Sequence, residues 1–202
     1  QNKGDYEKAK EYHFKALEIS KRVNLKNRTA LIHENIARVY LKQNQLEIAL
    51  AHLDTSYSIR TTLNEREGLA STQQAYAIYY QQKGLIDKAI DYAKQSLSGA
   101  RQLKLAVLTK DAHELLSDLY LRKNNNTDAL YHYKEFIALR DSIYSIEKTK
   151  EITPMLDLIN KKIGKGSVLV GTHLKSKDWQ SAQETRSPAY TTAWKDIAIV
   201  KA

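Results

Sequence analysis

The feature that most constrains the fold is a pattern that recurs every forty residues. The stretches GDYEKAKEY (4–12), NQLEIALAH (44–52) and GLIDKAIDY (84–92) align without a gap. In this register the same alanine recurs four times, as Ala9, Ala49, Ala89 and Ala129. Similarity at a fixed period is typical of repeat proteins, in which each unit packs on its neighbours. The function of such a chain is expected to lie in the array.

A second set of aligned columns precedes each of the last three alanines. It combines a large apolar, a small and a tyrosine residue, as Ile36, Ala37, Tyr40; Tyr76, Ala77, Tyr80; and Leu116, Ser117, Tyr120. Spacings of three and four place these residues on one face of a helix. Small residues allow two helices to approach within about 8–10 Å. The pattern therefore predicts helical hairpins that stack on one another.

The expected fold class is all-α, because the chain has only seven Gly and two Pro. Breaks between the helices of a hairpin are expected at Asn44, Gly84 and the run 124–126, since Gly and Asn tolerate the left-handed conformation that ends helices. Three full hairpins and an N-terminal half-repeat should form about seven antiparallel helices. Their predicted ranges are 4–22, 27–43, 45–62, 67–83, 85–102, 107–123 and 126–146.

These columns resemble the tetratricopeptide repeat (TPR), whose consensus is W-x2-L-G-x2-Y followed by A-x3-F. The tyrosine and the alanine are kept here, while the tryptophan position holds His33, Gln73 and His113, the closing proline is missing, and the period is 40. The resemblance covers about residues 1–146 and implies a TPR-like superhelix. Longer units of this kind are similar to those of bacterial TPR regulators.

A narrower resemblance rests on ALRDSIYSIEKTKEI, residues 138–152. This stretch is similar to the segment that joins TPR arrays to a coupling helix in bacterial sensor kinases and transcription regulators. Pro154 departs from that pattern, because an interior proline lacks an N–H donor and should break or kink the helix. We therefore expect an array at 1–146 and a broken linker or capping helix at 147–163.

The remaining residues, 164–202, have a different composition, with three glycines, both tryptophans and many Ser and Thr. We expect an irregular or disordered tail, and a β-hairpin is the alternative. We assign this segment to no family from its residues. The chain starts at Gln1 without a signal-peptide pattern, so we expect a piece of a longer protein.

Few features of the sequence indicate catalysis or a metal site. The absence of cysteine excludes disulfides, thiol nucleophiles and cysteine-ligated metals. His33 and His113 lie two repeats apart and should not meet in one metal site, so structural or surface roles are expected for the histidines. The net charge of +9 is spread along the chain without a run of five like charges. We expect no enzyme, no cofactor and no metal.

In TPR superhelices the first helix of each hairpin lines a concave binding face. Carrying the family's binding positions over to this chain gives a set of mixed charge: Glu34, Arg38, Leu41, Lys42, Gln74, Ile78, Gln81, Gln82, Glu114, Asp118, Leu121 and Arg122. The family's clamp for a chaperone C-terminus needs Lys and Asn at the positions of Glu34 and Arg38. A chaperone-tail clamp is therefore not expected.

The predicted function is non-catalytic: binding of a protein or peptide partner, as a sensory or scaffold part of a bacterial signalling protein. The alternative is a fragment of a nucleic-acid-binding transcription regulator that uses the basic excess. The half-repeat face at Tyr6, Ala9 and Tyr12 is expected to be covered by a second copy, by the tail or by a preceding segment. The sequence leaves the cytoplasm and the periplasm open as compartments, and we favour the cytoplasm.

Overall fold

The computed structural model describes the backbone of residues 3–163 and the side chains of residues 6–158 and 161. This part of the chain forms seven helices and no strand: α1 (Lys3–Arg22), α2 (Lys26–Lys42), α3 (Leu46–Thr62), α4 (Arg66–Gln82), α5 (Ile86–Gln102), α6 (Ala106–Arg122) and α7 (Asn126–Ile163). The all-α prediction is confirmed, and the first six helices lie within one residue of their predicted ranges. The predicted tail lies outside the described residues.

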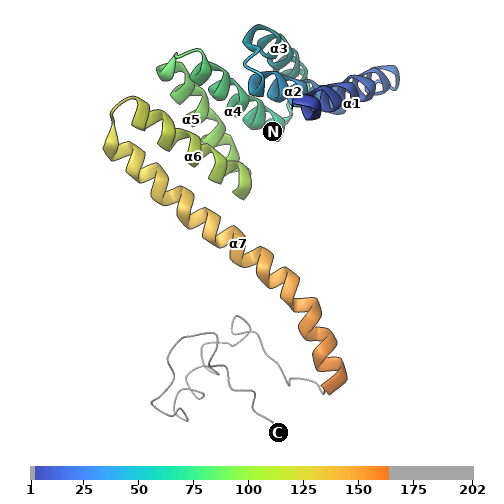
Figure 1. The fold of residues 1–202 in the computed structure, drawn as a ribbon, viewed down its shortest axis with the longest axis vertical. Helices are drawn as coiled ribbons and strands as arrows, with labels where there is room; N and C mark the ends of the chain where they lie inside the picture. Colours follow the sequence, from blue (N-terminus) through green and yellow to red (C-terminus); the bar gives the residue numbers. More distant parts are fainter. Residues whose placement is uncertain (1–2, 164–202) are drawn as a thin grey trace. The chain divides into compact units, whose positions relative to one another are not determined.

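Consecutive helices from α1 to α6 run antiparallel and pack side by side (Figure 1). The start of α7 contacts α6, where Ser117 Oγ donates to the carbonyl of Ala129 at 3.0 Å. The first helices of successive hairpins also contact each other, α2 with α4 and α4 with α6. The aligned alanines Ala49, Ala89 and Ala129 are at most 2% exposed. They lie in two apolar clusters, one around α2, α3 and α4 and one around α4 to α7. The recurring alanine is thus the contact that lets neighbouring helices approach.

Every helix from α1 to α6 ends in the same way, and the ends are twenty residues apart. A residue with positive φ follows each helix, at Asn24, Asn44, Asn64, Gly84, Lys104 and Asn124. The next residue donates its N–H to a carbonyl five positions earlier at 2.9 Å, as in Leu105 to Ala100. This is the Schellman C-cap. The forty-residue period therefore consists of two equal halves, each a helix and a short turn.

Two side-chain contacts recur with the repeat. A ring of each first helix stacks on a ring of the second at centroid distances of 5.2–6.0 Å: Tyr40 on His52, Tyr80 on Tyr92, and Tyr120 on His132. An acidic residue also accepts a hydrogen bond from the next repeat: Glu7 from Gln43, Glu47 from Lys83, and Asp87 from Lys123. Both contacts fix the register of neighbouring units.

The helix α7 differs from its prediction. It continues as one helix from Asn126 to Ile163 with Pro154 inside it, so the predicted break at this proline is wrong. Pro154 and Lys150, whose carbonyl loses its usual donor, are both exposed, and water can satisfy that carbonyl. The hydroxyl of Thr153 donates to the carbonyl of Thr149 at 2.8 Å in the same turn. The helix therefore tolerates the proline.

The chain divides into two units, Gln1–Tyr144 and Ser145–Ala202, and α7 crosses the division. The first unit holds the repeats and the groove described below. Across the part of the chain that the structure covers, no helix combines the length and apolar character needed to span a bilayer.

Candidate functional site

A groove of about 750 Å³ lies over the first helices of the three hairpins. Its lining comes from α2, α4 and the N-terminal end of α6 with the turn before it. The lining residues are Leu31, Glu34, Asn35, Arg38, Glu67, Ser71, Gln74, Lys104, Leu105, Ala106, Val107, Leu108 and Asp111. Three successive repeats thus contribute to one surface.

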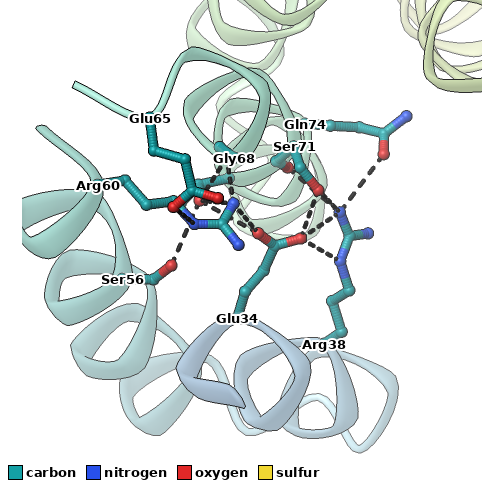
Figure 2. Close-up of polar contacts among 9 residues, drawn as sticks. Glu34, Arg38, Ser56, Arg60, Glu65, Gly68, Ser71 and Gln74 are labelled. Atoms are coloured by element: carbon teal, nitrogen blue, oxygen red, sulfur yellow. Dashed lines mark hydrogen bonds and ion pairs between the residues drawn. The ribbon is translucent and has the colours of Figure 1, made fainter. Parts of the chain in front are cut away.

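The floor of the groove is built around the carboxylate of Glu34, which is 2% exposed. One oxygen, Oε2, accepts hydrogen bonds from Arg60 Nη1 at 2.6 Å and from Thr72 Oγ1 at 3.2 Å. The other, Oε1, accepts from Ser71 Oγ at 2.6 Å and from Arg38 Nε at 2.9 Å (Figure 2). A buried charge is tolerated only when it is paired and hydrogen-bonded in this way. Glu34 therefore organises the groove and has little capacity left for a partner.

The arginine that neutralises Glu34 reaches it from α3. Arg60 is 2% exposed, and its Nη1 also donates to the carbonyl of Gly68. A Cβ at Gly68 would lie 2.6 Å from the guanidinium carbon of Arg60. Glycine is unfavourable inside a helix, and here it leaves the space that the arginine occupies. The pair joins the first two hairpins beneath the groove.

Arg38 connects α2 with α4 at the surface of the same network. Its Nη2 donates to the carbonyl and the hydroxyl oxygen of Ser71 at 3.2 and 3.3 Å, and it lies 3.5 Å from Oε1 of Gln74. The side chain is 31% exposed. Three residues predicted from the sequence, Glu34, Arg38 and Gln74, are therefore brought together in the groove.

The other predicted positions are placed differently. Leu41 is 3% exposed and belongs to the apolar core, so it has no surface for a partner. Ile78 and Gln81 are half-buried. The remaining six are exposed and lie outside the groove lining: Lys42, Gln82, Glu114, Asp118, Leu121 and Arg122. Their role as partner contacts stays a prediction.

The sequence did not predict ten of the thirteen lining residues, most of which lie toward the N-terminal ends of the helices. Five of the ten fall in two further repeat columns, with Leu31, Ser71 and Asp111 in one and Glu67 and Val107 in the other. Leu31 and Val107 are 45% and 58% exposed. An aliphatic residue on an otherwise polar helix face is the sequence pattern that could have indicated these positions.

Two pairs of histidines lie in the first and third hairpins and not in the second. His33 Nδ1 is 2.8 Å from His52 Nδ1, and His113 Nδ1 is 2.9 Å from His132 Nδ1. The corresponding residues of the middle repeat are Gln73 and Tyr92. Arg101 lies 2.9 Å from Nε2 of His113, so this nitrogen accepts and Nδ1–H donates to His132. The pairing was not predicted, although the shared spacing of nineteen residues indicates it.

These histidines are held neutral. Burial, with the neighbouring histidine and Lys21, lowers the pKa of His33 to about 4. Burial, with His132 and Arg101, lowers the pKa of His113 to about 4. Cations beside both pairs oppose a bound metal ion. Among the described residues no group of three or more His, Cys, Asp or Glu side chains is arranged to hold a metal.

Comparison with known proteins gives two findings besides the match to the repeats. The model of a domain of unknown function, DUF4113, matches residues 151–200, from the end of α7 onward. A curated relative, Protein SamB of Salmonella typhimurium, is 36% identical over 65 residues. The match covers 32% of this chain and 15% of that protein. The chain thus spans a small part of this relative's length.

The repeats themselves match a known family. The tetratricopeptide repeat model matches residues 1–62 and 28–102, which together span half of the chain. Stacked helical hairpins with the aligned Ala and Tyr columns are the structure that this family forms. Tetratricopeptide repeats generally mediate interactions between proteins, and arrays of this kind are typically non-catalytic. The chain belongs to the tetratricopeptide repeat family.

Proposed function

We propose that this chain is a protein-interaction module that binds a peptide or a segment of a partner protein in the groove across α2, α4 and α6. The observation that carries the proposal is the composition of the groove. Exposed Leu31 and Val107 stand at its walls, and polar side chains stand between them. A few apolar anchors surrounded by placed polar groups are typical of peptide-binding surfaces.

The network below the groove supports the same function. Arg38, Ser71 and Gln74 are held by hydrogen bonds to one another and to Glu34 before any partner arrives. A surface ordered in advance loses less conformational entropy when it binds. The floor of the groove is therefore fixed, and its polar groups can form hydrogen bonds with the backbone amides and polar side chains of a partner.

The wider role is proposed as sensory or scaffolding, in a bacterial signalling protein. Its support is the resemblance of residues 138–152 to the coupling segment of such proteins and the continuation of α7 to Ile163. In this role the array would bind a partner and α7 would connect it to another part of the protein. Co-purification of the natural full-length protein with a kinase or regulator partner, lost on groove substitution, tests it.

The groove proposal is tested by panning a phage-displayed library of random twelve-residue peptides on the purified chain. Ala106, an exposed residue of the lining, is replaced by tryptophan to fill the groove. Ala51, an exposed alanine of α3 outside the lining, receives the same substitution as the matched control. The selected peptides should bind the native chain and A51W equally and A106W at least tenfold more weakly. Equal binding to all three proteins would refute the proposal.

A further inference from the structure

We infer that the groove selects a basic partner segment, through a row of carboxylates on α6, and this inference rests on the proposed function of the groove. The row consists of Asp111, Glu114 and Asp118. Spacings of three and four residues put the three side chains on one face of the helix, along about 10 Å of its axis. Asp111 lies in the groove lining, and the other two continue from it.

The charge of this row is specific to the third repeat. The same three columns hold Leu31, Glu34 and Arg38 on α2, where Glu34 is buried and neutralised, and Ser71, Gln74 and Ile78 on α4. Only on α6 are all three positions acidic. The whole chain, by contrast, carries a net charge of +9. A local field of the opposite sign favours a partner of positive charge.

Some other acidic residues of the array have partners within the fold. Glu47 pairs with Lys83 at 2.7 Å, and Asp87 pairs with Lys123 at 2.6 Å. In the described part of the chain, neither Glu114 nor Asp118 has an ion pair, and both are exposed. Asp111 lies 2.9 Å from Lys110, its neighbour in the sequence. Two of the three carboxylates are therefore available to a partner.

The stability of helix α6 does not explain why these three positions are acidic. Carboxylates stabilise a helix near its N-terminus, and the effect is confined to the first turn. Glu114 stands in the middle of α6, and Asp118 stands close to its C-terminal end at Arg122. Asp118 therefore gains nothing from the helix dipole. Binding of a cationic group would give these exposed carboxylates a role that the helix dipole does not.

The other residues of the groove indicate which side chains, besides basic ones, the partner segment contains. Leu31 and Val107 are exposed in the lining and can receive one or two aliphatic side chains. Lys104 also lines the groove, Arg38 is held to Glu34, and Arg122 follows Asp118 at the end of α6. The cationic groups of the partner should therefore lie beside Glu114 and Asp118, and its aliphatic groups should contact Leu31 and Val107. The segment we expect is basic and mixed with aliphatic residues.

The test compares peptides selected from the same random library on two forms of the chain. The native chain should select peptides enriched in Lys and Arg. The charge-reversed variant E114K/D118K should select peptides enriched in Asp and Glu. For one selected basic peptide, the neutral variant E114Q/D118N should weaken binding about tenfold, and added salt should weaken the native complex.

The matched control removes two carboxylates elsewhere. Glu18 and Asp91 are exposed on α1 and α5, and the variant E18Q/D91N has the same change of net charge. It should bind the basic peptide within twofold of the native chain. If native-selected peptides are blocked by A106W but carry no excess of Lys or Arg, the inference fails and the groove function stands. If A106W blocks no peptide, both fail.

Discussion

At the scale of single residues, Glu34 is the residue whose observed role differs most from the predicted one. Sequence reasoning assigned it to partner binding, because it occupies a position that faces a partner in related arrays. The structure places it at the floor of the groove, between two arginines that occupy its carboxylate. The cause is Arg60 together with Gly68, two residues outside the aligned columns of the repeat. Sequence spacing alone does not show which arginine folds back onto a carboxylate.

Removal of this carboxylate should therefore destabilise the fold. In Glu34→Ala the buried guanidinium of Arg60 loses its carboxylate at 2.6 Å and keeps only that of Glu65 at 3.9 Å. We expect a loss of about 3–5 kcal/mol in unfolding free energy. Glu114 occupies the same repeat column, is exposed, and has no ion pair in the described part of the chain. Glu114→Ala should change stability by less than about 0.5 kcal/mol. Urea denaturation of both variants measures the difference, and equal losses would contradict the role assigned to Glu34.

The histidine pairs predict a dependence of stability on pH. Because the pKa of His33 and of His113 is about 4 in the folded chain and near 6.5 when unfolded, the unfolded state binds more protons between these values. Stability should therefore be constant above about pH 7 and fall as the pH decreases from 6.5 to 4.

The matched variant takes its residues from the middle repeat. His33→Gln with His52→Tyr introduces the residues found one repeat later, Gln73 and Tyr92. There Tyr92 stacks on Tyr80, as His52 stacks on Tyr40. The melting temperature of this variant should fall less than that of the native chain between pH 7.5 and 5. An identical fall in both proteins would show that the pair at His33 does not contribute.

At the scale of the element, the helices were largely predictable and their common end was not. The aligned alanines and tyrosines indicate where each helix lies, because packing selects them. The breaks at Asn44, Gly84 and Asn124 were predicted, since Asn and Gly are known helix-ending residues. Lys104 has φ +56 and carries no such signal. Its conformation is imposed by the twenty-residue spacing of the fold.

Lys104 should therefore be a strained position. A left-handed backbone costs a residue with a Cβ about 1–2 kcal/mol, and glycine avoids this cost. Lys104→Gly should stabilise the chain by about 1 kcal/mol in urea denaturation. Lys104→Ala removes the same side chain without relieving the backbone, and it should give no gain. A gain of equal size in both variants would mean that the charge, and not the backbone, is responsible.

The last helix shows the limit of a local rule. Proline predicted a break, yet α7 continues through Pro154. An interior proline removes one hydrogen bond, and the turns on either side still form theirs, including the bond from Thr153 to Thr149. Exposure allows water to take the freed carbonyl. An interior proline destabilises a helix by one lost hydrogen bond. The hydrogen bonds of the turns on both sides decide whether the helix still forms.

At the scale of the first unit, Gln1–Tyr144, function depends on the stacking of three hairpins. The groove takes residues from α2, α4 and α6, so no single repeat contains it. The period and the family positions indicated the right helices. They did not indicate the right turn, because the family positions run from the middle of each helix to its C-terminal end, whereas Glu67 and Val107 lie in the first turn. On α1, Tyr12 is 70% exposed and Tyr6 and Ala9 are half-buried. That a second copy, the tail or a preceding segment covers this face stays a prediction.

The most direct test of the groove as the binding site is site-specific photo-cross-linking. Benzoylphenylalanine replaces Val107 in the lining or, in a second protein, Ile48 of α3, which is 44% exposed and lies outside it. Each protein is irradiated with a peptide selected on the native chain. Covalent adduct should form from position 107 and not from position 48. Adduct from position 48 alone would contradict the assignment of the groove as the site where a partner binds.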